Sequence, residues 1–316
     1  MFAAEMERVD KLIESLSESD AGLIPKLTMH LVGSGGKRLR PVLTILAAKL
    51  CKYEGERHIR LAAAIEFIHT ATLLHDDVVD ESELRRGKQT ANHVWGNAAS
   101  VLVGDFLLSR AFQLMAQDGS LKVLQILSDT SAIISEGEVL QLMSMGDLAR
   151  EKETYIRIIS AKTAQLFAAG CEVGAVIADA GDAKENAMLE FGKNLGIAFQ
   201  IVDDALDYSA KQEQLGKAVG DDFREGKVTL PVLNAYAKAD KQGKTFWERT
   251  ISAHKQEEGD LAEAIRLIGA TNALDATMAE AKAYADKAAK ALEVFDDSDA
   301  KQALLDLLEF SVNRPY

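Results

Sequence analysis

Residues 61–80 read LAAAIEFIHTATLLHDDVVD, and this run predicts the architecture of the whole chain. Ile65, Ile68, Thr72 and Val79 follow one another at helical offsets, and the run is rich in Ala and Leu. A helix that is apolar nearly all round is typical of the interior of a large bundle. The run therefore predicts a long buried helix that ends in a group of aspartates.

The same kind of pattern continues along the chain without interruption by proline. The four prolines lie at positions 25, 41, 231 and 315, so residues 42–230 contain none, as expected for long helices. Residues 261–295 are rich in Ala, Lys and Glu and predict more exposed helices. Further apolar helical stretches occupy residues 99–117, 128–145, 154–178 and 187–209. Short turns, with no low-complexity linker, predict a single all-α domain over residues 1–316.

Composition and charge exclude several classes of protein. The chain has 316 residues, of which 47% are hydrophobic and 27% charged, and this is an ordinary globular composition. Its net charge of −13 argues against nucleic acid as a partner, since phosphate backbones select basic faces. No run of about 18 apolar residues occurs, so no transmembrane segment is expected. The acidic N-terminus is unlike a signal peptide and predicts a cytoplasmic location.

Three weaker patterns lead to no site by themselves. Gly33–Lys37 resembles a phosphate loop, but position 31 is Leu and Arg38 replaces the required Ser or Thr. His69 and His75 are six residues apart, which does not place both on one helical face for a transition metal. The two cysteines, Cys51 and Cys171, are far apart in sequence and suggest neither a disulfide framework nor a zinc site.

Two aspartate clusters carry the chemistry. Residues 76–80 read DDVVD and residues 203–207 read DDALD, so the first and last aspartate of each cluster stack at i and i+4 on a helix. A single such run is usually a solvated acidic face. Here each run follows apolar helix, where carboxylates are destabilising unless they are paired or bind metal. Two facing clusters of oxygen ligands, without Cys or His, favour Mg²⁺ together with substrate phosphates.

Basic side chains occur near both clusters in the sequence. Arg suits bidentate phosphate contacts and Lys acts as a point charge, although any one of them is more often a surface cation. Together with the aspartates they suggest a site that binds two strongly anionic groups. These cations are Lys37, Arg38, Arg40, Arg85, Arg86, Lys162, Lys217 and Lys227.

The motifs taken together resemble those of the trans-polyprenyl diphosphate synthases, and most of all the bacterial octaprenyl branch. The resemblance runs in family order from about residue 33 to residue 234, and the set is specific although one DDxxD is not. It implies a large all-α bundle with a central apolar cavity. The motifs are GGKRLRP, IEFIHTATLLHDDVVDESELRRG, GNAASVLVGDFLLSRAF, AKTAQLF, GIAFQIVDDALDY and GDDFREGKVTLP.

The resemblance also implies a role for each matching residue. Asp76, Asp80 and Asp203 would hold about three Mg²⁺ ions, with Asp77, Asp204 and Asp207 in support. Residues expected to bind the diphosphate of isopentenyl diphosphate are Lys37, Arg40, His69 and Arg86, so that His69 changes from a core residue to a ligand. Residues expected to contact the allylic diphosphate are Arg85, Lys162, Thr163, Gln200, Lys217 and Lys227.

The implied reaction follows from charge. Diphosphate leaves once its negative charge is neutralised, the double bond of isopentenyl diphosphate attacks the allylic cation, and a proton is lost. Apolar helix walls would exclude water, which would otherwise trap the cation. The small residues Ala71 and Thr72, in the turn before the first cluster, would leave room for a long tail. We therefore expect a long product of roughly seven to ten units. The resemblance further implies that this product is octaprenyl diphosphate, made from a primer such as farnesyl diphosphate for a quinone side chain, and that the enzyme is a homodimer.

Other functions remain open at this point. A shorter-chain synthase, such as a geranylgeranyl synthase, would share every motif. A terpene cyclase would share the fold but normally has a different second metal motif, where this chain has DDALD. A non-catalytic regulatory subunit should have lost one cluster or the basic GGKRLRP segment, and this chain retains all of them. A lipid product could bring such an enzyme to a membrane surface.

Overall fold

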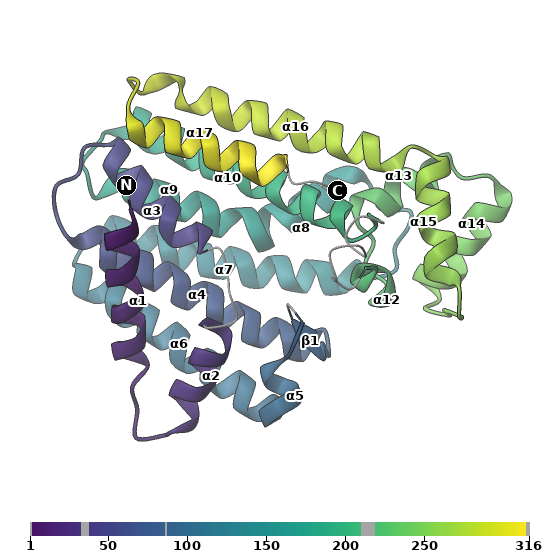
Figure 1. The fold of residues 1–316 in the computed structure, drawn as a ribbon, viewed down its shortest axis with the longest axis horizontal. Helices are drawn as coiled ribbons and strands as arrows, with labels where there is room; N and C mark the ends of the chain where they lie inside the picture. Colours follow the sequence, from purple (N-terminus) through teal and green to yellow (C-terminus); the bar gives the residue numbers. More distant parts are fainter. Residues whose placement is uncertain (1, 33–37, 86, 210–218, 314–316) are drawn as a thin grey trace. The chain divides into compact units, whose positions relative to one another are not determined.

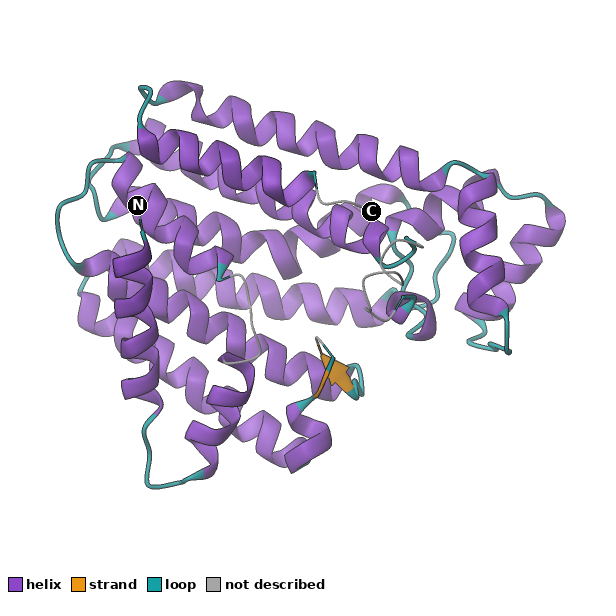
Figure 2. Cartoon of the chain, viewed as in Figure 1, coloured by secondary structure: helices purple, strands orange, loops and turns teal. Residues whose placement is uncertain are grey.

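A computed structural model describes residues 2–32, 38–85, 87–209 and 219–313. Over these residues the chain is helical apart from its turns and one small hairpin (Figure 2). The prediction of an all-α fold is therefore confirmed. The helix predicted from residues 61–80 is α4, Arg57–Val79, and it ends at the first aspartate cluster as expected.

The elements follow one another as labelled in Figure 1. The N-terminal part of the chain contains α1 (Ala3–Ser17), α2 (Leu23–Val32), α3 (Leu39–Leu50), α4, β1 (Leu84–Arg85), β2 (Lys88–Gln89), α5 (Ala91–Trp95), α6 (Asn97–Asp118) and α7 (Leu121–Met143). The middle contains α8 (Lys152–Ile159), the π-helical turn η1 (Ser160–Ala164), α9 (Gln165–Val176), α10 (Asp182–Leu206) and α12 (Asp221–Arg224). The C-terminal part contains α13 (Leu230–Lys238), α14 (Lys241–Trp247), η2 (Glu248–Ser252), α15 (Asp260–Ala270), α16 (Ala273–Ala291), η3 (Leu292–Val294) and α17 (Asp299–Val312).

The chain divides into two compact units. The first unit comprises Met1–Ala132, Leu166–Gly192 and Leu292–Leu304, and the second comprises Ile133–Gln165, Lys193–Ala291 and Leu305–Tyr316. The first aspartate cluster belongs to the first unit and the second cluster to the second. The prediction of one domain over the whole chain, with a central cavity between the clusters, stays a prediction.

Helix α4 forms the centre of the first unit and packs along α6. Near one end of the contact, the Arg57 guanidinium donates two hydrogen bonds to Asp118, at 2.8 and 2.7 Å. Near the other end, the Ser100 hydroxyl donates to the carbonyl of Leu74 at 3.0 Å. These contacts fix α6 along the helix that carries Asp76, Asp77 and Asp80.

Helix α9 packs closely on its neighbours in the first unit through glycines. A Cβ atom at Gly174 would lie 2.6 Å from Ala47 Cβ of α3, and one at Gly192 would lie 2.5 Å from the carbonyl oxygen of Phe167. Contacts this short leave no room for a side chain, so these glycines set the approach of α3 and α10 to α9. The approach places the Phe167 ring beneath Arg40 of α3, whose guanidinium lies 4.5 Å from the ring centroid.

The core of the second unit is built around aromatic residues. Trp247 and Phe223 are almost fully buried, and their rings meet edge to face with centroids 6.4 Å apart. Phe246 packs on both rings, at 5.2 Å from Trp247 and 6.4 Å from Phe223. Since Phe223 belongs to the GDDFREGK segment, this core anchors that segment beside the second cluster.

The chain differs from the sequence prediction at residues 154–178. The pattern predicts one continuous helix, whereas the structure has α8, then a π-helical turn over Ser160–Ala164, then α9. A π turn carries one extra residue in the hydrogen-bonded ring, and such turns are frequent at functional sites. This turn contains Lys162 and Thr163, two of the predicted diphosphate ligands.

A short hairpin follows the first cluster. Its strands pair antiparallel with Leu84 opposite Gln89 and Arg85 opposite Lys88, and Gly87 takes a positive φ of 74° in the turn. Gly accepts this conformation without strain. The hairpin brings Arg85 back toward α4.

Helix α6 bears on the expectation that the chain has no transmembrane segment. It is long and apolar enough, by length and composition, to cross a membrane, although only 39% of its most apolar window is buried. Among the residues that the structure describes, no other helix is both long enough and apolar enough. It also contains Asp105 and Arg110 and packs along α4, as expected for a packed helix with one apolar outer face.

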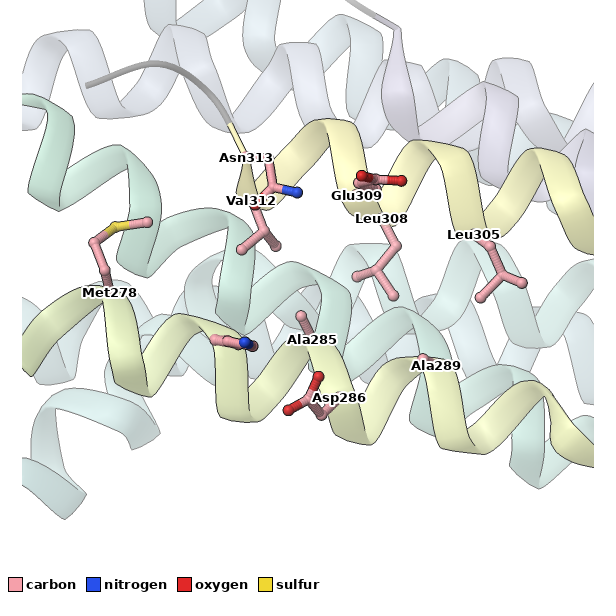
Figure 3. Close-up of a pocket in the computed structure, with 10 residues that line it drawn as sticks. Met278, Ala285, Asp286, Ala289, Leu305, Leu308, Glu309, Val312 and Asn313 are labelled. Carbon is pink, nitrogen blue, oxygen red and sulfur yellow. The ribbon is translucent and has the colours of Figure 1, made fainter. Parts of the chain in front are cut away.

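A groove runs between α16 and α17 in the second unit (Figure 3). Its volume is about 680 Å³, and apolar side chains such as Leu305, Leu308 and Val312 lie along it beside Lys282 and Glu309. Neither aspartate cluster lines this groove. It is therefore distinct from the cavity predicted between the clusters.

Candidate active site

Both aspartate clusters lie at the carboxyl ends of long helices. The last turn of α4 continues into the first cluster, because the amide of Asp80 donates to the carbonyl of Asp76 at 2.8 Å. The amide of Asp207 likewise donates to the carbonyl of Asp203 at the end of α10, at 3.2 Å. A helix carboxyl end has a partial negative charge, so carboxylates there repel it unless cations are present. The position of both clusters therefore favours cation binding.

The middle aspartate of the first cluster is buried and ion-paired. Asp77 is fully buried, and its Oδ1 accepts from Arg85 Nε at 2.8 Å and Nη2 at 2.7 Å. Burial raises the pKa of Asp77, and the Arg85 guanidinium opposes that rise. Asn92 fixes the same turn from outside, because its side-chain amide donates to the backbone carbonyl of Asp77 at 3.0 Å. Asp77 thus holds the hairpin against α4.

The middle aspartate of the second cluster is held on both sides by neutral donors. Asp204 is 4% exposed; its Oδ2 accepts from the Tyr155 hydroxyl at 2.6 Å and its Oδ1 from Gln200 Nε2 at 2.7 Å. Gln200 in turn accepts from the Thr163 hydroxyl at 2.9 Å. Burial raises the pKa of Asp204 to about 7, although these donors act to lower it.

The last aspartate of the second cluster holds the GDDF turn. Asp207 Oδ1 accepts from the amides of Gly220 and Asp221, both at 3.2 Å, and Oδ2 accepts from the amide of Asp222 at 2.9 Å. Burial raises the pKa of Asp207 to about 6, and these amides oppose the rise. Burial, together with Asp204 and Asp207, also raises the pKa of Asp222 well above its ordinary value. Several buried carboxylates therefore repel one another in this turn, close in sequence to Asp203.

The remaining aspartates of the clusters are accessible. Asp76 and Asp80 are half-buried on one side of α4, and Asp203 is exposed on α10. Among the described residues, no group of three or more His, Cys, Asp or Glu side chains is arranged to hold a metal by itself. Mg²⁺ commonly uses only one or two carboxylates and takes its other ligands from water and substrate phosphates. Hard oxygen donors, few in number and open to ligand, therefore fit this ion.

Two residues predicted to bind isopentenyl diphosphate lie together. Arg40 Nη1 is 3.1 Å from His69 Nε2, and the Arg40 guanidinium also stacks on Phe167. Arg40 Nε is buried without a hydrogen-bond partner among the described residues. Arg38, for which the sequence predicts no individual role, pairs with Glu66 at 2.7 Å and anchors the start of α3 to α4.

Two predicted ligands of the allylic diphosphate have carboxylate neighbours. Lys162 Nζ pairs with Glu138 Oε2 of α7 at 2.7 Å, and Lys227 pairs with Glu225. Gly137 permits the first pair, because a Cβ there would lie 2.8 Å from Ala161 Cβ in the π turn. The ammonium group of each lysine is therefore held in place by an ion pair with a glutamate.

Some predictions cannot be compared with the structure. Lys37, Arg86 and Lys217 lie outside the described residues. Arg85 lies within them, and the structure pairs it with Asp77. The roles of all the predicted site residues toward substrate and metal stay predictions.

Three contributors to this site were missed from the sequence. Tyr155 donates to Asp204, Glu138 pairs with Lys162, and Asp222 repels Asp207. None of the three belongs to either aspartate cluster. Tyr155 and Glu138 lie at 49 and 24 residues from their partners in the chain. Asp222 had a visible signal, since it lies in the quoted GDDFREGK segment.

The residues predicted to set chain length differ in exposure. Ala71 is only 1% exposed, whereas Thr72 is half-buried and lies one helical turn before Asp76 on the same side of α4. His69, Thr72 and Asp76 thus form a partly accessible stripe on a helix that is otherwise mostly buried. The open surface at this turn is offered by Thr72 more than by Ala71.

Comparison with known proteins identifies the class of this site. The polyprenyl synthetase family model matches residues 22–268. The chain is 46% identical to the octaprenyl diphosphate synthases of Haemophilus influenzae, covering 99% of this chain and 94% of that one, and of Escherichia coli, covering 99% and 97%. Its structure resembles a polyprenyl synthase from Caulobacter crescentus complexed with calcium and isoprenyl diphosphate, with a TM-score of 0.96, 52% identity and coverage of 99% and 95%. It also resembles a decaprenyl diphosphate synthase from Rhodobacter capsulatus, with a TM-score of 0.94, 49% identity and coverage of 98% and 96%.

The fold is thus that of the all-α isoprenoid synthases. The chain belongs to the polyprenyl synthetase family and is an enzyme, a prenyltransferase.

The buried state of Asp204 leads to a testable pH dependence. Its pKa is raised on folding, so the folded chain binds a proton more tightly than the unfolded chain between about pH 4 and pH 7. The contribution of Asp204 to stability is therefore present at low pH and is lost as pH rises toward 7. With divalent cations removed by chelator, we expect Asp204→Asn to gain thermal stability relative to wild type as pH rises from 5 to 8. If the melting temperatures of the two proteins change with pH in parallel, the pKa of Asp204 is not raised by burial.

Proposed function

We propose that the chain elongates an allylic diphosphate with successive isopentenyl diphosphate units to a long product, octaprenyl diphosphate. The observation that carries this proposal is the pair of helix-end aspartate clusters, each with one buried, hydrogen-bonded aspartate and accessible neighbours. Similarity at 46% identity to two octaprenyl diphosphate synthases supports the length. Incubation with farnesyl diphosphate, labelled isopentenyl diphosphate and Mg²⁺, followed by product sizing, tests it.

Asp76, Asp80 and Asp203 are the proposed metal-holding residues. When bound there, about three Mg²⁺ ions would neutralise the charge that develops on the departing diphosphate. The three aspartates are accessible, and the Caulobacter crescentus relative was solved with calcium and isoprenyl diphosphate. Asp77, Asp204 and Asp207 support them by fixing the surrounding turns.

The basic residues divide between two diphosphates in this proposal. Arg40 and His69 of the first unit would bind isopentenyl diphosphate, together with Lys37 and Arg86. The residues proposed to bind the allylic diphosphate are Arg85, Lys162, Thr163, Gln200, Lys217 and Lys227. With each substrate varied in turn, Arg40→Gln would raise the KM for isopentenyl diphosphate, and Lys227→Gln would raise the KM for the allylic substrate. The apolar helices that carry these residues would exclude water from the cation.

Loss of either cluster's accessible aspartate should stop turnover without unfolding the chain. Asp76→Ala and Asp203→Ala remove carboxylates that face ligand and not the core, so we expect turnover to fall by orders of magnitude with little change in the thermal unfolding followed by circular dichroism. Excess EDTA should have the same effect on wild type. Full turnover in EDTA, or near wild-type turnover in either variant, would show that the clusters do not act through metal.

Product length should respond to bulk in the turn before the first cluster. Interiors are close-packed, so an aromatic ring and a prenyl tail cannot share one space. We expect Ala71→Phe to stop elongation at three or four units while the first condensation continues, as measured by mass spectrometry of extracted products. Thr72→Phe is the companion variant, since Thr72 is the more exposed of the two. An active Ala71→Phe protein with products of wild-type length would show that the tail does not pass Ala71.

We also propose that the enzyme is a homodimer through the outer face of α6. Val101, Leu102 and Phe112 are 39%, 67% and 41% exposed and lie at helical spacing, opposite the buried Leu107 and Ala111. Exposed apolar faces of this kind commonly mark interfaces. In sedimentation, Leu102→Asp should convert a dimer to a monomer, whereas Leu121→Asp, at a more exposed leucine of α7, should leave the dimer intact. A monomeric wild type would contradict this proposal.

Other aspects stay predictions. A cytoplasmic location, contact of the lipid product with a membrane surface and a quinone as the destination rest on sequence and resemblance alone. The shorter-chain, terpene cyclase and regulatory alternatives have less support, because the similar proteins named above are long-chain or polyprenyl synthases.

A further inference from the structure

Asp204 receives its two hydrogen bonds from different directions. Gln200 lies four residues earlier on α10 itself, so its bond to Asp204 stays within one helix. Tyr155 belongs to α8, is 2% exposed and donates to the other oxygen of Asp204 at 2.6 Å. The Tyr155 bond therefore joins two helices, whereas the Gln200 bond does not.

A second contact joins the same two segments. Thr163, in the π turn that follows α8, donates to Gln200 at 2.9 Å. Side chains from α8 and its π turn thus hold successive turns of α10 at Gln200 and Asp204. These two ties fix the rotation of the last turn of α10 about its axis.

The rotation of that turn decides where Asp203 points. Consecutive residues on a helix differ by about 100° in direction, since a helix has 3.6 residues per turn. A side chain locked inward at Asp204 therefore leaves Asp203 directed outward, and Asp203 is indeed exposed. Any rotation that releases Asp204 would turn Asp203 away from this direction.

We propose that Tyr155 is a positioning residue, which acts through Asp204 to aim Asp203 at the metal and diphosphate. The proposal rests on the proposed function, in which Asp203 holds metal. Tyr155 itself touches neither substrate nor metal. Groups that orient metal ligands from behind commonly change metal affinity by 10- to 100-fold when they are removed.

Tyr155→Phe tests the role of the hydroxyl alone. The ring keeps its volume, but a buried oxygen of Asp204 loses its donor and the carboxylate reorients toward other partners. We expect the affinity for Mn²⁺ in the presence of inorganic diphosphate, measured by calorimetry, to fall about tenfold. The Mg²⁺ concentration for half-maximal turnover should rise by a similar factor, with little change in the KM for isopentenyl diphosphate.

Tyr208→Phe is the matched control. Tyr208 is 1% exposed, lies one residue after the second cluster, and its hydroxyl donates to no aspartate of that cluster. The same chemical change at the same depth should leave Mn²⁺ affinity at the wild-type value. Equal losses in the two variants would overturn the proposal, because they would reflect general loosening of the core.

A double-variant cycle tests whether Tyr155 acts through Asp204. Asp204→Asn and the double variant with Tyr155→Phe are compared with each single change. If the hydroxyl works only through this carboxylate, the double variant loses no more Mn²⁺ affinity than the weaker-binding single variant. Additive losses would overturn the proposal.

Two further variants keep the test decisive. If Tyr155→Phe does not fold, 4-aminophenylalanine at position 155 keeps a donor in the same place and should restore folding and most Mn²⁺ affinity; wild-type-like affinity in a folded Tyr155→Phe protein would overturn the proposal. Asp203→Ala separates the two claims. If that variant binds Mn²⁺ and diphosphate like wild type, it is the proposed metal-holding role of Asp203 that fails.

Discussion

Much of this chain is organised by the need to give each buried carboxylate a donor. An ionised carboxylate taken from water into an apolar interior is strongly destabilising unless charge or hydrogen bonds replace the lost hydration. At Asp77 the replacement is the Arg85 guanidinium, supplied by a hairpin. At Asp204 it is a pair of neutral donors from Tyr155 and Gln200. Each solution draws a separate element onto the end of a long helix, and the accessible aspartates take their positions from it.

The two clusters share a sequence pattern, but different interactions stabilise their middle aspartates. A cation compensates the charge of Asp77, whereas Asp204 depends on dipoles, and burial raises its pKa to about 7. Asp207 has a third arrangement, in which three backbone amides bind its carboxylate and close the GDDF turn. The family resemblance implies two metal-holding aspartates in the first DDxxD run and one in the second, and says nothing of how the middle aspartates are held. In the structure the first cluster is charge-paired and the second is hydrogen-bonded and richer in nearby carboxylates.

The sequence predicted the features that depend on local periodicity. The α4 helix, its end at Asp76–Asp80 and the all-α class follow from apolar spacing and the absence of proline. The π turn over Ser160–Ala164 could not be foreseen, because no Gly or Pro marks it and its residues fit an ordinary helix. The hairpin after α4 is too short for an alternating pattern, and the partner of Asp204 lies 49 residues away in sequence. Long-range contacts of this kind leave no local signal.

The unequal burial of the aspartates has a consequence for how this sequence can diverge. A glutamate at position 76 or 203 would extend one methylene toward solvent, where a longer arm can still reach a cation. The same exchange at position 77 or 204 would force that methylene into a closed site whose donors already fit a shorter side chain. The middle aspartates are therefore constrained by volume and the accessible ones by charge. In a related chain, an aspartate kept at position 77 or 204 would therefore indicate that the helix end is packed in the same way. An acidic residue kept at position 76 or 203 would indicate that a metal ligand is preserved.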